Sequence, residues 1–215
     1  MRVPNRKPPT KAELIADGVV HGVGLTAGMV GTLVLLIVAT AYGEARHVIA
    51  AAVYAFGLLA MLSCSAAYNL LRDHPRRGIL RGLDHSAIYV MIAGSYTPFL
   101  TTLKDAWVVG LTGSMWVLAG IGILLKMALP NVNEAVSISF YLALGWMGII
   151  AFWPLTETLG QTTLTLLAVG GVIYSVGVIF HVVEKIPFNN AIWHTFVLGA
   201  AVIHYIAVIR TVRAT

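Results

Sequence analysis

The stretch Gly31–Thr40, which reads GTLVLLIVAT, decides the fold class of this 215-residue chain. It carries no charged side chain, and similar continuous apolar runs follow at Val108–Leu125 and Leu164–Phe180. An α-helix rises about 1.5 Å per residue, so roughly 20 apolar residues cross a hydrocarbon core of about 30 Å. Because the runs are continuous and do not alternate with polar residues, they favour membrane-spanning helices over the strands of a β-barrel.

The composition of the whole chain agrees with this interpretation. Hydrophobic residues make up 58% of the sequence and charged residues only 11%, whereas soluble domains carry about 25% charged residues. The only cysteine, Cys64, lies inside an apolar run, so the sequence predicts neither a disulfide framework nor a thiolate metal site. The chain is therefore expected to be a polytopic membrane protein whose function depends on its few polar groups at membrane depth.

The runs predict an all-α fold, a bundle of seven transmembrane helices. The short connections leave no room for a soluble domain, so a basic N-terminal segment, residues 1–18, is expected to precede one membrane domain, residues 19–210. The helices are predicted near residues 19–42, 48–71, 84–103, 107–128, 135–153, 162–183 and 191–210.

The basic residues predict the orientation of the bundle. If the N-terminus is cytoplasmic, ten lysines and arginines face inside and four face outside, which satisfies the positive-inside rule and places the C-terminus outside. This bias also accounts for most of the net charge of +5, so no nucleic-acid partner is needed and no soluble partner is evident; membrane lipids are the expected partners. The inside set is Arg2, Arg6, Lys7, Lys11, Arg72, Arg76, Arg77, Arg81, Lys126 and Lys185, and the outside set is Arg46, Lys104, Arg210 and Arg213.

With this topology, polar side chains gather at the cytoplasmic ends of several helices. Ser65 and Asn69 share one face of the second helix, and Asn190 and His194 share one face of the seventh, because each pair is spaced i, i+4. Polar groups that face a membrane bundle are costly unless they pair or bind something, so the cluster is a candidate site around a small polar cavity. Its members are Glu13, Asp17, His21, Ser65, Asn69, Asp84, His85, His181, Asn190 and His194.

Other interpretations stay open for some of these residues. Asp84 precedes His85 at the predicted start of the third helix and is also typical of an N-cap. His47 and His74 are expected to be solvated loop residues. His204, midway along the seventh helix, is either a hydrogen-bonded packing residue or part of the lining of an internal cavity.

Five sequence segments resemble motifs of the bacterial haemolysin III proteins. These proteins belong to the progestin and adipoQ receptor superfamily, which is related to the alkaline ceramidases. The resemblance implies seven helices with a cytoplasmic N-terminus in the bacterial inner membrane. The segments are DHSAIY at Asp84–Tyr89 with IAGSYTPF at Ile92–Phe99, AIWHTFVL at Ala191–Leu198, SAAY at Ser65–Tyr68, and Glu13 with HGVG at His21–Gly24.

The resemblance also implies a zinc site. In the superfamily three histidines hold the ion, an aspartate positions its water and a serine lies beside it. The ligand positions correspond here to Asn69, Asn190 and His194, the aspartate to Asp84 and the serine to Ser65. Two expected histidines are thus asparagines, and a carboxamide oxygen is a poor zinc ligand. A displaced site of His21, His85, His194 and Asp84 is an alternative.

Three functions follow from this pattern. The first is a role in membrane-lipid homeostasis or sensing, with cytolysis as a consequence of overproduction. The second is a zinc-dependent hydrolase of lipid amides or esters, in which Asp84 acts as general base and Ser65 stabilises the oxyanion. The third is a small channel or proton-linked transporter that uses the histidines and carboxylates.

Overall fold

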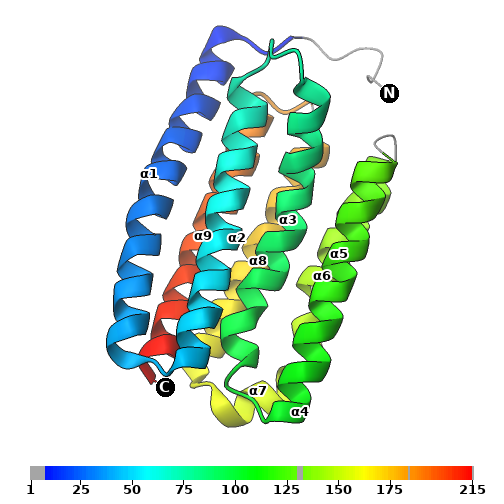
Figure 1. Ribbon diagram of the computed structural model, residues 1–215. Coiled ribbons are helices and arrows are strands. Elements are labelled where there is room, and N and C mark those ends of the chain that lie inside the picture. Colours follow the sequence, from blue (N-terminus) through cyan, green and yellow to red (C-terminus); the bar gives the residue numbers. More distant parts are fainter. Residues whose placement is uncertain (1–7, 130–132, 184, 215) are drawn as a thin grey trace.

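The computed structural model describes residues 8–129, 133–183 and 185–214, and this part of the chain is a helical bundle without strands (Figure 1). Of the basic residues used to predict the orientation, Arg2, Arg6 and Lys7 lie outside the described residues, as do Pro130–Val132 and Glu184 of two predicted connections. The elements are α1 (Lys11–Tyr42), α2 (Ala45–Leu70), α3 (Arg77–Leu100), α4 (Asp105–Trp107), the π-helix η1 (Val108–Thr112), α5 (Gly113–Ala128), α6 (Glu134–Gly145), the 3₁₀ helix η2 (Met147–Ile149), α7 (Phe152–Thr158), α8 (Gln161–Val182) and α9 (Asn189–Ala214).

Five described helical segments are long and apolar enough to cross a membrane: α1, α2, Val108–Ala128, α8 and α9. A sixth is added if the bent pair Glu134–Ile149 and Phe152–Thr158 is one span. Helix α3 is not among them, in keeping with the charges of Arg77, Arg81 and Asp84 in its first turns. The prediction of an all-helical, multi-pass membrane protein is thus confirmed, with five to six candidate spans among the described residues.

Two helices begin earlier than the apolar runs predict. Helix α1 starts at Lys11 and not near residue 19, because Thr10 and Glu13 form a capping box in which each side chain accepts from the other's backbone N–H. Helix α3 starts at Arg77 and not near residue 84. Asp84 therefore lies inside α3, and its interpretation as an N-cap is wrong.

The environment of His47 also differs from the prediction. His74 does lie in an exposed connection, as expected. His47, in contrast, belongs to the first turn of α2 and is only 4% exposed. The charged residues near His47 predict a solvated loop there, but the connection between α1 and α2 ends before it. His47 therefore lies in the helix and is buried.

The predicted helix at residues 135–153 is broken, with a bend of 50° between its two parts. The hydroxyl of Tyr96, on α3, donates to the carbonyl oxygen of Gly145 and accepts from the backbone N–H of Gly148 at 3.0 Å. A side chain at Gly148 would meet the ring of Tyr96, with its Cβ 2.8 Å from the phenol oxygen. The phenol thus replaces helical hydrogen bonds at the junction of α6 and η2, a few residues before the bend, and such substitution allows irregular backbone inside a membrane bundle.

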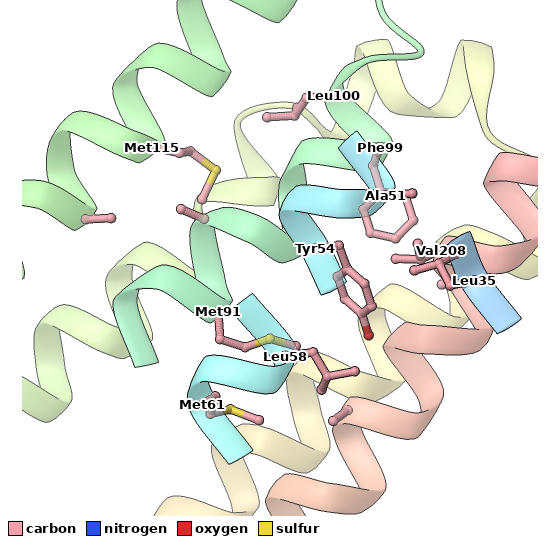
Figure 2. Packing of buried hydrophobic residues seen from close by; sticks show 14 of the residues in the cluster. Leu35, Ala51, Tyr54, Leu58, Met61, Met91, Phe99, Leu100, Met115 and Val208 are labelled. Carbon is pink, nitrogen blue, oxygen red and sulfur yellow. The ribbon is translucent and has the colours of Figure 1, made fainter. Parts of the chain in front are cut away.

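The core centres on α2 and α3, which contact each other most extensively. Figure 2 shows Tyr54 and Leu58 of α2 packed with Leu35 of α1 and Val208 of α9, beside Met91 and Phe99 of α3. Many large apolar side chains remain exposed on the outer helix faces, including Val109, Leu124 and Trp153 at 75%, 69% and 75% exposure. Such faces are suited to lipid and not to water.

Small residues set the distance between α2 and α3. A Cβ at Gly57 would lie 3.2 Å from the carbonyl oxygen of Val90, and one at Gly94 would lie 3.3 Å from that of Val53. Both neighbours are backbone atoms, which cannot rotate away. The two glycines therefore allow the helices to approach closely, as small residues do in other membrane bundles.

We predict that Gly57→Leu lowers the stability of the protein in detergent by about 1–3 kcal/mol or more, because the new side chain forces α2 and α3 apart. The measurement is thermal unfolding by circular dichroism. Gly199→Leu is the matched control, since a Cβ at Gly199 meets no described atom within 4 Å. Equal unfolding temperatures for the two variants would contradict the close approach.

Candidate functional site

A buried carboxylate joins α1 to α9 at one end of the bundle. Asp17, on α1, is 2% exposed. Its Oδ1 accepts from Nδ1 of His194 at 2.6 Å, and its Oδ2 accepts from Nδ2 of Asn190 at 2.9 Å, both on α9. Because a carboxylate can only accept, His194 presents its Nδ1–H to Asp17 and leaves its Nε2 as the atom that faces Ser65.

The two asparagines at the family ligand positions bind each other. Nδ2 of Asn190 donates to Oδ1 of Asn69 at 3.1 Å, and Nδ2 of Asn69 donates to the carbonyl oxygen of Ser65 at 3.0 Å. The structure thus brings Asn69, Asn190 and His194 together, as the motif alignment requires. The carboxamides are occupied by hydrogen bonds to one another and to Asp17. Zinc prefers imidazole ligands, which these two positions do not supply.

A different set of donors lies beside them. Asp17, His21 and His194 place their ligand atoms within 4.8 Å of one another. Nε2 of His21 is 3.7 Å from Oδ1 of Asp17, and the two imidazole rings are 4.4 Å apart. Among the described residues Nε2 of His21 has no hydrogen-bond partner although it is buried. Two imidazoles and a carboxylate are ligand types that fit zinc, so these three residues form a candidate metal site.

Ser65 and Asp84 flank this set on α2 and α3. Oγ of Ser65 is 3.5 Å from Nε2 of His194, and Ser65 also interacts with the carboxyl group of Asp84. The displaced metal site of the sequence analysis included His85 and Asp84. In the structure the third member of the candidate metal-binding group is Asp17, and neither His85 nor Asp84 belongs to it.

The polar groups lie at one end of an internal cavity of about 320 Å³. Ser65, Asp84, His85 and His194 line it there, and the side chains of His181 and Glu134, 3.0 Å apart, line it nearby. Further along, its wall is mostly apolar and reaches the break beside Tyr96. The apolar part includes Met91, Phe99, Ile149, Leu155, Leu164 and Leu167.

Of the three residues predicted to line the polar cavity, two line it in the structure and one does not. His21 and His85 line the cavity, whereas Glu13 is not among its lining residues. The carboxylate of Glu13 instead accepts from the backbone N–H groups of Thr10 and Phe188, at 2.8 Å and 3.0 Å. His204 combines the two interpretations left open for it: its Nε2 bonds to the carbonyl oxygen of Leu167 at 3.2 Å, and its ring lines the cavity.

The comparisons with known proteins give one consistent family. The model described as "Haemolysin-III related" matches residues 12–205. The chain belongs to the haemolysin-III-related family. It is 37% identical to the "Hemolysin-3 homolog" of Bacillus subtilis (strain 168) over 201 residues, which cover 93% of this chain and 94% of that protein. It is 38% identical to "Hemolysin-3" of Bacillus cereus over 204 residues, covering 94% and 93%.

This haemolysin-III-related protein also has animal relatives. The human "Monocyte to macrophage differentiation factor" is 30% identical over 210 residues, which cover 94% of this chain and 86% of that protein. No solved structure gives a significant match to the chain. The family resemblance inferred from the motifs is therefore confirmed over nearly the whole length.

Asp17 belongs to the polar cluster that the sequence predicts, but it is not among the predicted ligand or catalytic positions. Asp17 and His21 are spaced i, i+4, the same signal that selected Ser65 with Asn69 and Asn190 with His194. Applying that spacing rule to the first helix would have placed a carboxylate and an imidazole on the same face, beside the predicted ligand positions.

We predict that Asp17→Ala destabilises the haemolysin-III-related protein by about 1–3 kcal/mol, because the partly buried donors on Asn190 and His194 lose an acceptor. Thermal unfolding in detergent measures the change. Asp73→Ala makes the same substitution in an exposed connection and should leave the unfolding temperature nearly unchanged. If both variants unfold at the wild-type temperature, Asp17 does not join α1 to α9.

Proposed function

We propose that this protein binds a membrane lipid or a lipid-derived amphiphile and acts in membrane-lipid homeostasis or sensing. The observation that carries the proposal is the cavity of about 320 Å³, which is polar at the end near Asp84 and His194 and apolar towards Phe99 and Leu155. An amphiphile matches this division, because its head finds hydrogen-bonding groups and its hydrocarbon tail finds apolar walls. Lysis, which the names of two relatives suggest, would then follow from disturbed lipid packing on overproduction.

The proposal includes a topology. Helix α3 would be a seventh crossing, because its polar side chains face α2 and the cavity and can be tolerated there, away from lipid. The N-terminus would be cytoplasmic, the C-terminus outside and the membrane the bacterial inner membrane, in line with the positive-inside bias. Residues 1–18 and 19–210 would form the N-terminal segment and the membrane domain.

We predict that Gly171→Leu reduces binding of dansyl-undecanoic acid, a fluorescent amphiphile, by about tenfold or more, because the new side chain enters the cavity near Trp146 and takes the place of the tail. Fluorescence titration of the purified protein in detergent measures the affinity. Gly120→Leu is the control, since a Cβ there meets no described atom within 4 Å and the residue is not among those lining the cavity. Absence of saturable binding to the wild type would refute the proposal.

A second candidate function is a metal-dependent lipid hydrolase, and the donor set of Asp17, His21 and His194 favours it. These residues would hold zinc, which when bound would activate a water and polarise a carbonyl group. Asp84 would then accept the proton of the attacking water, and the hydroxyl of Ser65 would donate to the oxyanion. Both side chains line the cavity beside His194, where the head of an amphiphile would lie.

We predict that zinc copurifies with the wild-type protein and that His21→Ala removes most of it, since one of three ligands is lost. Metal content is measured by plasma mass spectrometry after purification in mild detergent without chelators. His74→Ala, in an exposed connection, should retain the wild-type content. A wild type without zinc, or an unchanged content in His21→Ala, would leave the hydrolase without its metal site.

A further inference from the structure

A second cavity, of about 350 Å³, lies at the end of the bundle opposite the Asp17 cluster. It is formed where α2 and α8 begin and where α7 and α9 end, close to the turn between α1 and α2 and to the C-terminal end of the chain in Figure 1. Polar and basic side chains line much of it: Arg46, His47, Thr158, Thr163 and Arg210. Neither candidate function above involves this end of the molecule.

His47 is the most unusual group in this second cavity. Its side chain lines the cavity, the residue is 4% exposed, and neither ring nitrogen has a hydrogen-bond partner among the described residues. An imidazole carries at least one N–H in every protonation state. A buried donor without an acceptor costs about 1–3 kcal/mol. Both ring nitrogens are covered in the orientation shown, so a ligand that supplies an acceptor would recover that cost once the ring rotates towards the cavity.

Two helix N-termini meet at the same place. The first turn of α2, 26 residues long, and that of α8, 22 residues long, both line the cavity. Glu44, the N-cap of α2, makes no side-chain capping hydrogen bond, and Gly160, the N-cap of α8, has no side chain to make one. Free N–H groups and the positive end of the helix dipole make such termini favourable for anions.

The charged side chains also favour an anion. Arg46 pairs with Glu44 at 3.4 Å on the exposed rim, with both side chains more than half exposed. Arg210, on α9, forms no ion pair with any carboxylate of the described residues. The cavity lining therefore includes two guanidinium groups and one carboxylate, which give it a net positive charge without any contribution from His47.

We propose that this second cavity binds a phosphate-type oxyanion. Several acceptor oxygens on one centre match an arginine fork, an imidazole N–H and helix N-termini together. Since α2, α8 and α9 are candidate membrane spans, their ends lie near the level of lipid headgroups. The oxyanion is either the phosphate of a lipid headgroup or free inorganic phosphate, which share this chemistry.

The test uses the full-length protein purified in a phosphate-free, uncharged detergent, with inorganic phosphate as the probe in isothermal titration calorimetry. We expect saturable binding that Arg210→Gln and Arg46→Gln each weaken by about tenfold or more, because each removes a charge-assisted contact. Arg213→Gln is the matched control, because Arg213 lies on the same helix end but not among the cavity-lining residues, and it should change the affinity less than about twofold.

A second arm distinguishes the two sources. Native mass spectrometry from nanodiscs that contain equal amounts of phosphatidylglycerol and an uncharged glycolipid reports retained lipid. Retention of phosphatidylglycerol that falls in Arg210→Gln but not in Arg213→Gln supports a headgroup site, and calorimetric binding without lipid retention supports free phosphate. The proposal is overturned if the wild type binds neither probe, or if Arg210→Gln and Arg213→Gln behave alike in both arms.

Discussion

One buried carboxylate determines how three helices of this bundle meet. Burying a charge away from water is very unfavourable unless hydrogen bonds and opposite charges surround it. Asp17 meets that requirement only when α1 lies against α9, where Asn190 and His194 donate to its two oxygens. Asn190 then reaches Asn69 on α2. The end of the bundle that holds the candidate site is therefore specified by polar contacts, while close packing and apolar contacts specify the rest.

Tyr96 has a comparable role at the other end of the larger cavity. Its hydroxyl bonds Gly145 and Gly148 at the junction of α6 and η2, so the irregular backbone there does not leave these polar groups without partners. The same junction forms part of the cavity wall: Tyr96, Gly145 and Gly148 line the cavity, as does Trp146, whose indole N–H donates to Ser175 of α8 at 3.1 Å.

The sequence predicts the long apolar spans because continuous runs such as Gly31–Thr40 are stable in a membrane as helices, and five to six of the seven predicted spans are confirmed as candidates among the described residues. It also predicts that Asn69, Asn190 and His194 meet, since topology and helical spacing bring them to one leaflet. It does not predict the irregular backbone after Gly145, whose polar groups depend on a partner on another helix, Tyr96. It also misplaces His47, because the charged residues Glu44 and Arg46 beside it indicate a solvated loop and give no local signal that the histidine packs inward.

The hydrogen bonds that join Asp17, Asn69 and Asn190 have an evolutionary consequence. Each of the three side chains satisfies another, so a change at any one position leaves a buried group unsatisfied at the next. Residues coupled in this way have non-additive effects on stability. A lineage that converted either asparagine to a histidine would pass through a less stable intermediate, and this epistasis would keep the carboxylate and the two carboxamides together as one inherited unit.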